Sequence, residues 1–121
     1  MTRAARACKV DANQPEIVDT FRKLGCSVAI TSSAGDGFSD LVVGVAGLNL
    51  LVEVKDGSKV PSAQKLTKDQ VKFRDNWRGQ YCVVNSVNQA IELVNRVRRS
   101  GSLNSGWACC NGPEISGVAK R

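Results

Sequence analysis

The stretch Gly37-Phe-Ser-Asp-Leu-Val-Val-Gly44, followed by Leu50-Leu-Val-Glu-Val-Lys55, decides how this chain folds. Both segments are short runs of apolar and β-branched residues, a composition typical of buried strands. Each run also carries charge, because Asp40 opens the first and Glu53 and Lys55 end the second. Side chains alternate along a strand, so Glu53 and Lys55 point to one face while the opposite face is wholly apolar.

The short link around Ala46 and Gly47 suggests a β-hairpin, although its register does not follow from the sequence. If the hairpin forms, Asp40 and Glu53 converge on one side of it, with Lys55 beside them. Two carboxylates and an ammonium group suit a divalent metal ion and a phosphate, because Mg²⁺ prefers carboxylate oxygens and bridges to phosphate oxygens. The alternative is an ion pair at a strand edge that discourages aggregation. The Glu-x-Lys tripeptide alone favours that alternative, whereas Asp40 at a fixed step upstream favours the metal site.

Asp40, followed by Glu53-Val-Lys55 at the end of the next strand, resembles the signature of the PD-(D/E)XK nucleases. The stretch from Gly37 to Gln70 is similar to the VRR-NUC branch and, more distantly, to archaeal Holliday-junction resolvases. Ser39 stands where the family usually has proline, a departure that touches the turn and not a ligand. The similarity covers roughly residues 13–98 and implies a restriction-endonuclease-like α/β fold, an αβββαβα core around a mixed four-stranded sheet.

Hydrophobic periodicity predicts the same order of elements independently of the resemblance. Pro15 in the first turn and Gly25 after the last turn bound the first helix, and Thr67 and Gln70 have the spacing of a capping box. Residues 58–65 are predicted to be a polar, mobile loop. The expected elements are a helix from residue 13 to 24, strands over 26–31, 40–44 and 50–55, a helix over 67–78, a strand over 80–85 and a helix from residue 86.

At 121 residues the chain is expected to form one domain with basic ends. We expect a basic arm over residues 1–12, the nuclease domain over 13–100, and a Gly/Ser linker with a tail over 101–121 that contains Trp107, Cys109 and Cys110. The net charge of +6 fits a polyanionic partner such as DNA, although solubility alone would also account for it.

Cysteine and histidine usage narrows the chemistry. The five cysteines are irregularly spaced without a Cys-x-x-Cys pair, and the chain has no histidine, which argues against a structural zinc site and a histidine base. Cys26 and Cys82 are predicted to be small core residues. No run of 18 apolar residues and no secretory signal occurs, so we expect a reduced cytoplasmic protein without a membrane span. By resemblance to phage and bacterial recombination nucleases, it would act in a bacterial cytoplasm or a phage-infected host.

The resemblance implies a role for each residue of the site. Asp40 and Glu53 would be metal ligands, the Val54 carbonyl a third oxygen ligand, and Lys55 would orient or activate the attacking water. Glu16 resembles an extra ligand on the first helix, although an acid there also suits the helix dipole.

Gln70 resembles a glutamine that supports the site from the second helix. It also completes the capping box, and its helix face, shared with Phe73 and Trp77, is predicted to point inward. Five basic residues in and before this helix would track phosphates, although each alone could be an ordinary surface charge. They are Lys59, Lys65, Lys68, Lys72 and Arg74.

The function implied by the resemblance is a Mg²⁺- or Mn²⁺-dependent endonuclease that cuts DNA phosphodiesters and leaves a 5′-phosphate. Branched DNA, including Holliday junctions, is the expected substrate, and two symmetric cuts would call for a homodimer. The alternatives are a nuclease of flap, single-stranded or linear duplex DNA, a catalytically silent DNA-binding module, and an α/β interaction protein in which the motif is accidental.

Overall fold

The computed structural model describes residues 10–100, so most of the expected basic arm and the whole tail with Trp107, Cys109 and Cys110 lie outside it. The elements follow the order αβββαβα, as predicted. They are α1 (Gln14–Lys23), β1 (Ser27–Ile30), β2 (Leu41–Val45), β3 (Leu48–Val54), a short 3₁₀ helix η2 (Pro61–Gln64), α2 (Lys68–Asn76), β4 (Tyr81–Val84) and α3 (Val87–Ser100).

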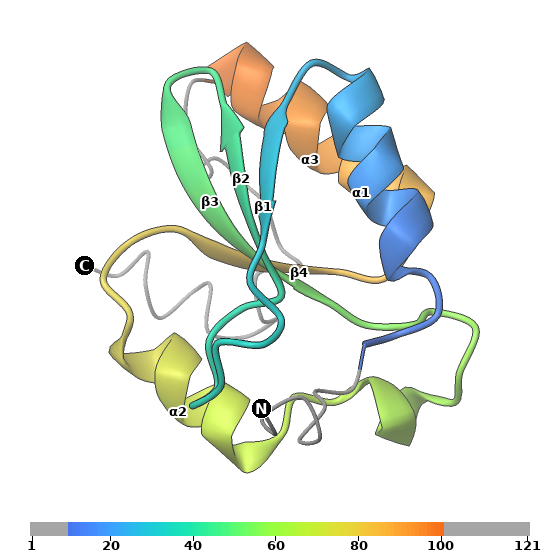
Figure 1. Ribbon diagram of the computed structural model, residues 1–121, viewed down its shortest axis with the longest axis vertical. Helices are drawn as coiled ribbons and strands as arrows, with labels where there is room; N and C mark the ends of the chain where they lie inside the picture. The colour runs from blue at the N-terminus through green and yellow to red at the C-terminus, as the bar shows by residue number, and fades with distance from the viewer. Residues whose placement is uncertain (1–9, 101–121) are drawn as a thin grey trace, which may run out of the picture.

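The four strands form one mixed sheet in the order β1-β2-β3-β4 (Figure 1). The first three strands pair antiparallel, and β4 lies parallel to β3. A parallel neighbour requires a crossover connection, which here runs through η2 and α2. The prediction of a mixed sheet is confirmed.

The β2–β3 hairpin has a two-residue turn that sets its register. Ala46 and Gly47 both have positive φ angles, 53° and 80°, as a type I′ turn requires. Leu41 therefore pairs with Val52. This register brings Asp40, the residue before β2, close to Glu53, and their side chains form a hydrogen bond.

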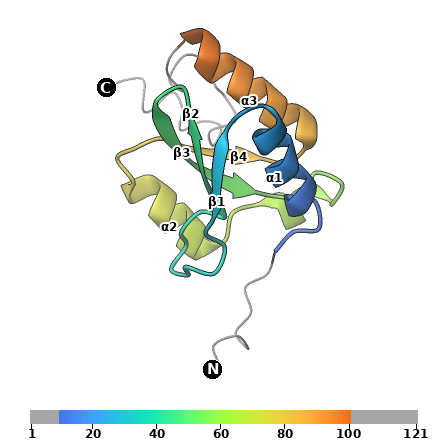
Figure 2. The ribbon, with the colours of Figure 1, turned by 45° about the horizontal axis from the view of Figure 1, so that its top comes forward.

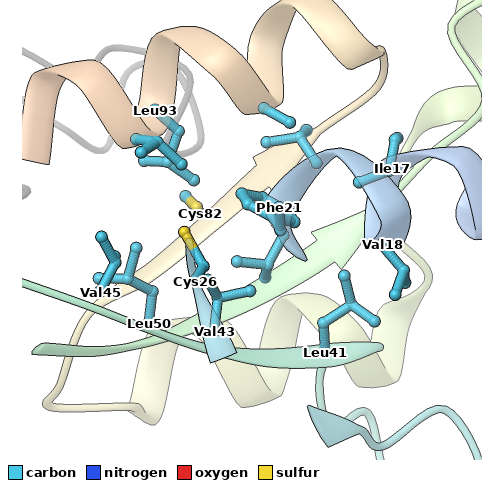
Figure 3. Close-up of a cluster of buried hydrophobic side chains, with 14 of the residues drawn as sticks. Ile17, Val18, Phe21, Cys26, Leu41, Val43, Val45, Leu50, Cys82 and Leu93 are labelled. Atoms are coloured by element: carbon cyan, nitrogen blue, oxygen red, sulfur yellow. The ribbon is translucent and has the colours of Figure 1, made fainter. Parts of the chain in front are cut away.

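The main core lies between one face of the sheet and the two helices α1 and α3, which lie side by side (Figures 1 and 3). Phe21 and Leu93 are fully buried there against Val43 and Leu50 of the sheet. Cys26 and Cys82 are buried free thiols in this core, which confirms their prediction as small core residues. Among residues 10–100, no helix is both long and apolar enough to span a membrane.

Helix α2 covers the opposite face of the sheet near the ends of β3 and β4 (Figure 2). None of its residues is fully buried. Phe73 is its main contact, since its ring meets Phe38 edge-on at 5.3 Å and Tyr81 at 6.2 Å between centroids. The predicted inward orientation of Trp77 is wrong: α2 ends at Asn76, Trp77 has an extended backbone (φ −79°, ψ 131°), and its side chain stacks on Phe73 while staying 41% exposed.

The predicted loop over residues 58–65 has more structure than expected. It contains η2, and the side chain of Gln64 ties the segment down. Its amide nitrogen donates to the carbonyl of Lys59 at 2.7 Å, and its oxygen accepts from Asn85 at 3.1 Å. These hydrogen bonds join the loop after β3 to the residue that follows β4.

Candidate active site

Two carboxyl groups meet at the end of the β2–β3 hairpin, on the face covered by α2. Glu53 is only 2% exposed although it lies within a strand of apolar residues. Asp40 precedes β2, and its Oδ2 accepts a hydrogen bond from the backbone N–H of Val54 at 2.9 Å. Ser39 is fully buried, and its hydroxyl donates to the carbonyl of Leu41 at 3.0 Å. The residue in the usual proline position therefore fixes the turn that delivers Asp40.

The two carboxyl groups shift each other's protonation. Burial, followed by the nearby charge of Asp40 and a hydrogen bond to it, raises the pKa of Glu53 to about 9. Burial also raises the pKa of Asp40, while the Val54 N–H and a hydrogen bond from Glu53 oppose that rise. Without a cation, burial and the repulsion between the two carboxylates therefore favour a proton held by the pair, and the larger rise of the pKa is at Glu53.

Lys55 and Gln70 complete the cluster. Lys55, only 9% exposed, places its Nζ 3.8 Å from Glu53 Oε2 and donates to Gln70 Oε1 at 2.9 Å. The Gln70 amide nitrogen donates to Glu53 Oε2 at 2.7 Å. The same Gln70 oxygen accepts from the backbone N–H of Thr67, so the capping box is also present. The two interpretations of Gln70 made from the sequence are therefore compatible, because one amide both caps α2 and connects the acid to the base.

The donor set fits a hard divalent cation. Glu53 Oε1 is buried and no N–H group donates to it, so a cation, or the proton shared with Asp40, would satisfy it. A cation would also relieve the repulsion that keeps one carboxyl protonated. Among residues 10–100, no three His, Cys, Asp or Glu side chains gather closely enough to hold a metal by themselves. Any ion here would complete its coordination with water, backbone oxygen or phosphate.

The remaining predicted ligands differ in their placement. Glu16 is exposed in the first turn of α1, where its neighbours Ile17 and Val18 face the core. The structure therefore does not bring Glu16 to the carboxyl pair, and its position at the helix start agrees with the dipole interpretation. The Val54 carbonyl stays a prediction, because the Val54 contact that the structure defines is its N–H to Asp40.

Two polar residues near the site were missed in the sequence. Asn13 donates from its side chain to the carbonyls of Lys55 at 3.0 Å and Asn85 at 3.1 Å, which joins the start of α1 to the ends of β3 and β4. Asp11 lies 3.9 Å from Lys59, and its charge contributes to the raised pKa of both Asp40 and Glu53. No local pattern marks either residue, since their partners lie more than 40 positions away.

The predicted phosphate-tracking residues divide into two groups. Lys59 pairs with Asp11, and Arg74 pairs with Asp75 at 2.9 Å. The other three are exposed, and no ion pair within residues 10–100 involves them. They are Lys65, Lys68 and Lys72.

Comparisons with known proteins return a similar solved structure but no match among protein families or curated sequences. No protein-family model and no curated protein sequence matches the chain. A solved structure described as a VRR_NUC domain is similar to it, with 30% sequence identity over 68% of this chain and 89% of that chain, and a TM-score of 0.48.

Proposed function

We propose that this protein is a divalent-metal-dependent nuclease whose reaction centre is formed by Asp40, Glu53 and Lys55. The observation that carries the proposal is the pair of buried carboxyl groups. Burying two acids side by side is unfavourable unless a cation offsets their charge. A lysine held beside the pair by a dedicated amide adds the second element of phosphodiester chemistry. A structural ion pair would need neither the second carboxyl group nor Gln70.

Each residue has a distinct task in this scheme. Asp40 and Glu53 would hold Mg²⁺ or Mn²⁺, which supplies Lewis-acid stabilisation of phosphoryl charge and lowers the pKa of water when bound. Lys55 would orient the attacking water and offset negative charge at the phosphate. Gln70 keeps the ammonium group of Lys55 at a fixed position relative to Glu53. The expected products carry a 5′-phosphate and a 3′-hydroxyl.

The substrate that we propose is DNA, with branched DNA preferred. The exposed lysines along the loop before α2 and on α2 itself support a polyanionic ligand next to the carboxyl pair. The preference for branches rests on the resemblance to junction resolvases, as does a homodimer that makes paired cuts.

Cleavage of a labelled four-way junction tests the proposal beside linear duplex, single-stranded and flap DNA, each with Mg²⁺, Mn²⁺ or EDTA. Glu53→Gln and Lys55→Met keep the buried volumes while removing the carboxylate and the ammonium group. Glu92→Gln, an exposed acid on α3, is the matched control. We expect metal-dependent cleavage by wild type and by the control, and strong loss in both site variants.

The cleavage pattern also separates the alternatives. Symmetric junction cuts support a resolvase, while flap or single-strand cuts keep the metal site and change the substrate class. Binding without cleavage under either metal would contradict the nuclease proposal and leave a silent DNA-binding module. Neither binding nor cleavage would point to an interaction protein with an accidental motif.

A further inference from the structure

Helix α2 is followed directly by an exposed aromatic residue, Trp77, that the proposed reaction does not use. Trp77 stacks on Phe73 with ring centroids 5.2 Å apart and planes inclined by 17°, yet 41% of the residue stays exposed. Gly79 permits this position, because a Cβ there would lie 2.7 Å from the indole Nε1. The indole is therefore held in place on one side while the rest of its surface faces solvent.

A shallow groove of about 380 Å³ lies against this indole. Its walls combine two aromatic rings with hydrogen-bonding groups, and they are Asp36, Asp69, Lys72, Phe73, Asn76 and Trp77. Two carboxylates disfavour a phosphate in the groove itself. A nucleobase fits this chemistry better, because it has a flat π-face for stacking and exocyclic amino groups that donate to carboxylates and amide oxygens.

The groove belongs to the same helix as the active-site amide. Trp77 is seven positions after Gln70, and α2 supplies six of these steps, which corresponds to roughly 10 Å along the helix axis. That length equals about three base steps of 3.4 Å along one strand. Phe73 links the two ends, since it contacts both Trp77 and Tyr81, and Tyr81 pairs with Leu51 on the face that also carries Glu53.

We infer that Trp77 is a stacking platform for an unpaired base of the substrate strand, about three nucleotides or fewer from the phosphate at the active site. A base inside a duplex already has both faces covered by its neighbours. The platform therefore selects single-stranded, frayed or branched segments over continuous duplex. The inference rests on the proposed function for the position of the phosphate, whereas the stacking itself requires no cleavage.

Binding of the full chain to DNA in EDTA tests the platform without any reaction. The probes are hairpins with a single-stranded arm, each with 2-aminopurine at one position of the arm, and a blunt duplex. Trp77→Leu keeps an apolar side chain without a π-face, and Trp77→Phe keeps the π-face. Ile30→Ala, which alters an apolar side chain 57% exposed on β1, is the control.

We expect one arm position to show strong quenching of 2-aminopurine that Trp77→Leu abolishes and Trp77→Phe retains. Trp77→Leu should weaken binding to the armed probe roughly 5- to 150-fold, the range for loss of one base–aromatic stack. Binding to the blunt duplex should not change in either variant. Removing the base at the quenched position should weaken binding to the wild-type protein by the same factor. The same change in the probe should not weaken binding to Trp77→Leu any further.

Two results would overturn the inference. Equal binding by Trp77→Leu and wild type to the armed probe would show that no base stacks on the indole. Loss of self-association in Trp77→Leu, measured by sedimentation, with DNA affinity unchanged, would instead assign this face to a second copy of the chain. Because binding is measured in EDTA, failure of cleavage would count against the nuclease proposal alone.

Discussion

Replacing Glu53 with glutamine should make the metal-free protein more stable at neutral and alkaline pH. Burial and Asp40 raise the pKa of Glu53 from its ordinary value of 4.5 to about 9 in the folded state. The folded protein therefore keeps a proton that the unfolded chain releases above its own pKa. The contribution of Glu53 to the free energy of unfolding is therefore fully present below its pKa in the unfolded chain. It is lost as the pH rises toward its pKa in the folded protein.

The magnitude follows from the two pKa values. At about pH 7.5, roughly three pH units above the unfolded value, the loss is on the order of 4 kcal/mol, because each unit corresponds to about 1.4 kcal/mol. Glutamine is neutral at every pH and avoids this loss while it keeps nearly the same shape. The variant should therefore gain stability relative to wild type progressively from acid to neutral pH.

Urea unfolding in EDTA at several pH values measures this effect, with Glu92→Gln as a control that removes an exposed acid. We expect the free-energy difference between Glu53→Gln and wild type to grow with pH, and that of the control to stay nearly constant. Parallel pH profiles for Glu53→Gln and wild type would refute the reasoning, since they would mean that Glu53 ionises as readily in the folded protein as in the unfolded chain.

Three further predictions follow from the contacts. Gln70→Ala should lower nuclease turnover by about 10- to 100-fold, as expected when a residue that orients an active-site group is lost. Thr67→Ala should lose about 1 kcal/mol of stability from the helix cap and keep its turnover. Equal turnover of the two variants in steady-state assays would contradict this prediction. Gly35→Ala, at a φ of +81° with open space around it, should cost about 1–2 kcal/mol in urea unfolding. Gly37→Ala, also at positive φ, would drive a Cβ into the Asp69 carbonyl oxygen, so it should cost about 1–3 kcal/mol more than Gly35→Ala. Equal costs for the two variants would show that the loop does not pack on α2. Phe21→Ala, which empties a fully buried site, should cost about 3–5 kcal/mol, and a loss below about 1 kcal/mol in calorimetry would contradict the assigned core.

The order of elements was predictable because each carries a local signal. Apolar periodicity, the Thr67–Gln70 box and the glycines after the helices depend only on nearby residues. The hairpin register was not predictable, because it depends on the positive φ of Ala46, a residue that rarely adopts such a conformation. The face of Trp77 was predicted wrongly because the helix was expected to run to residue 78, whereas it ends at Asn76 and the extended backbone of Trp77 no longer follows helical spacing.

The candidate site was predictable in part for the same reason. Glu53 and Lys55 follow from strand alternation and Asp40 from the expected hairpin, whereas Gln70 follows from the resemblance and from its helix face. Asp11 and Asn13 were missed because they reach the site through contacts between distant parts of the chain. Glu16 was a candidate ligand because of its place on the first helix, but it lies on the solvent-exposed side of α1.

The central claim is that the Asp40–Glu53 pair is a divalent-cation site, and calorimetric titration of Mg²⁺ and Mn²⁺ tests it most directly. Buffers of different ionisation enthalpy report the protons released on binding. We predict that wild type binds the ion and releases about one proton per ion at about pH 7.5, because the cation displaces the proton held by Glu53. Glu53→Gln should lose this binding while Glu92→Gln keeps it. Equal binding by wild type and Glu53→Gln, or no binding by wild type, would contradict the claim.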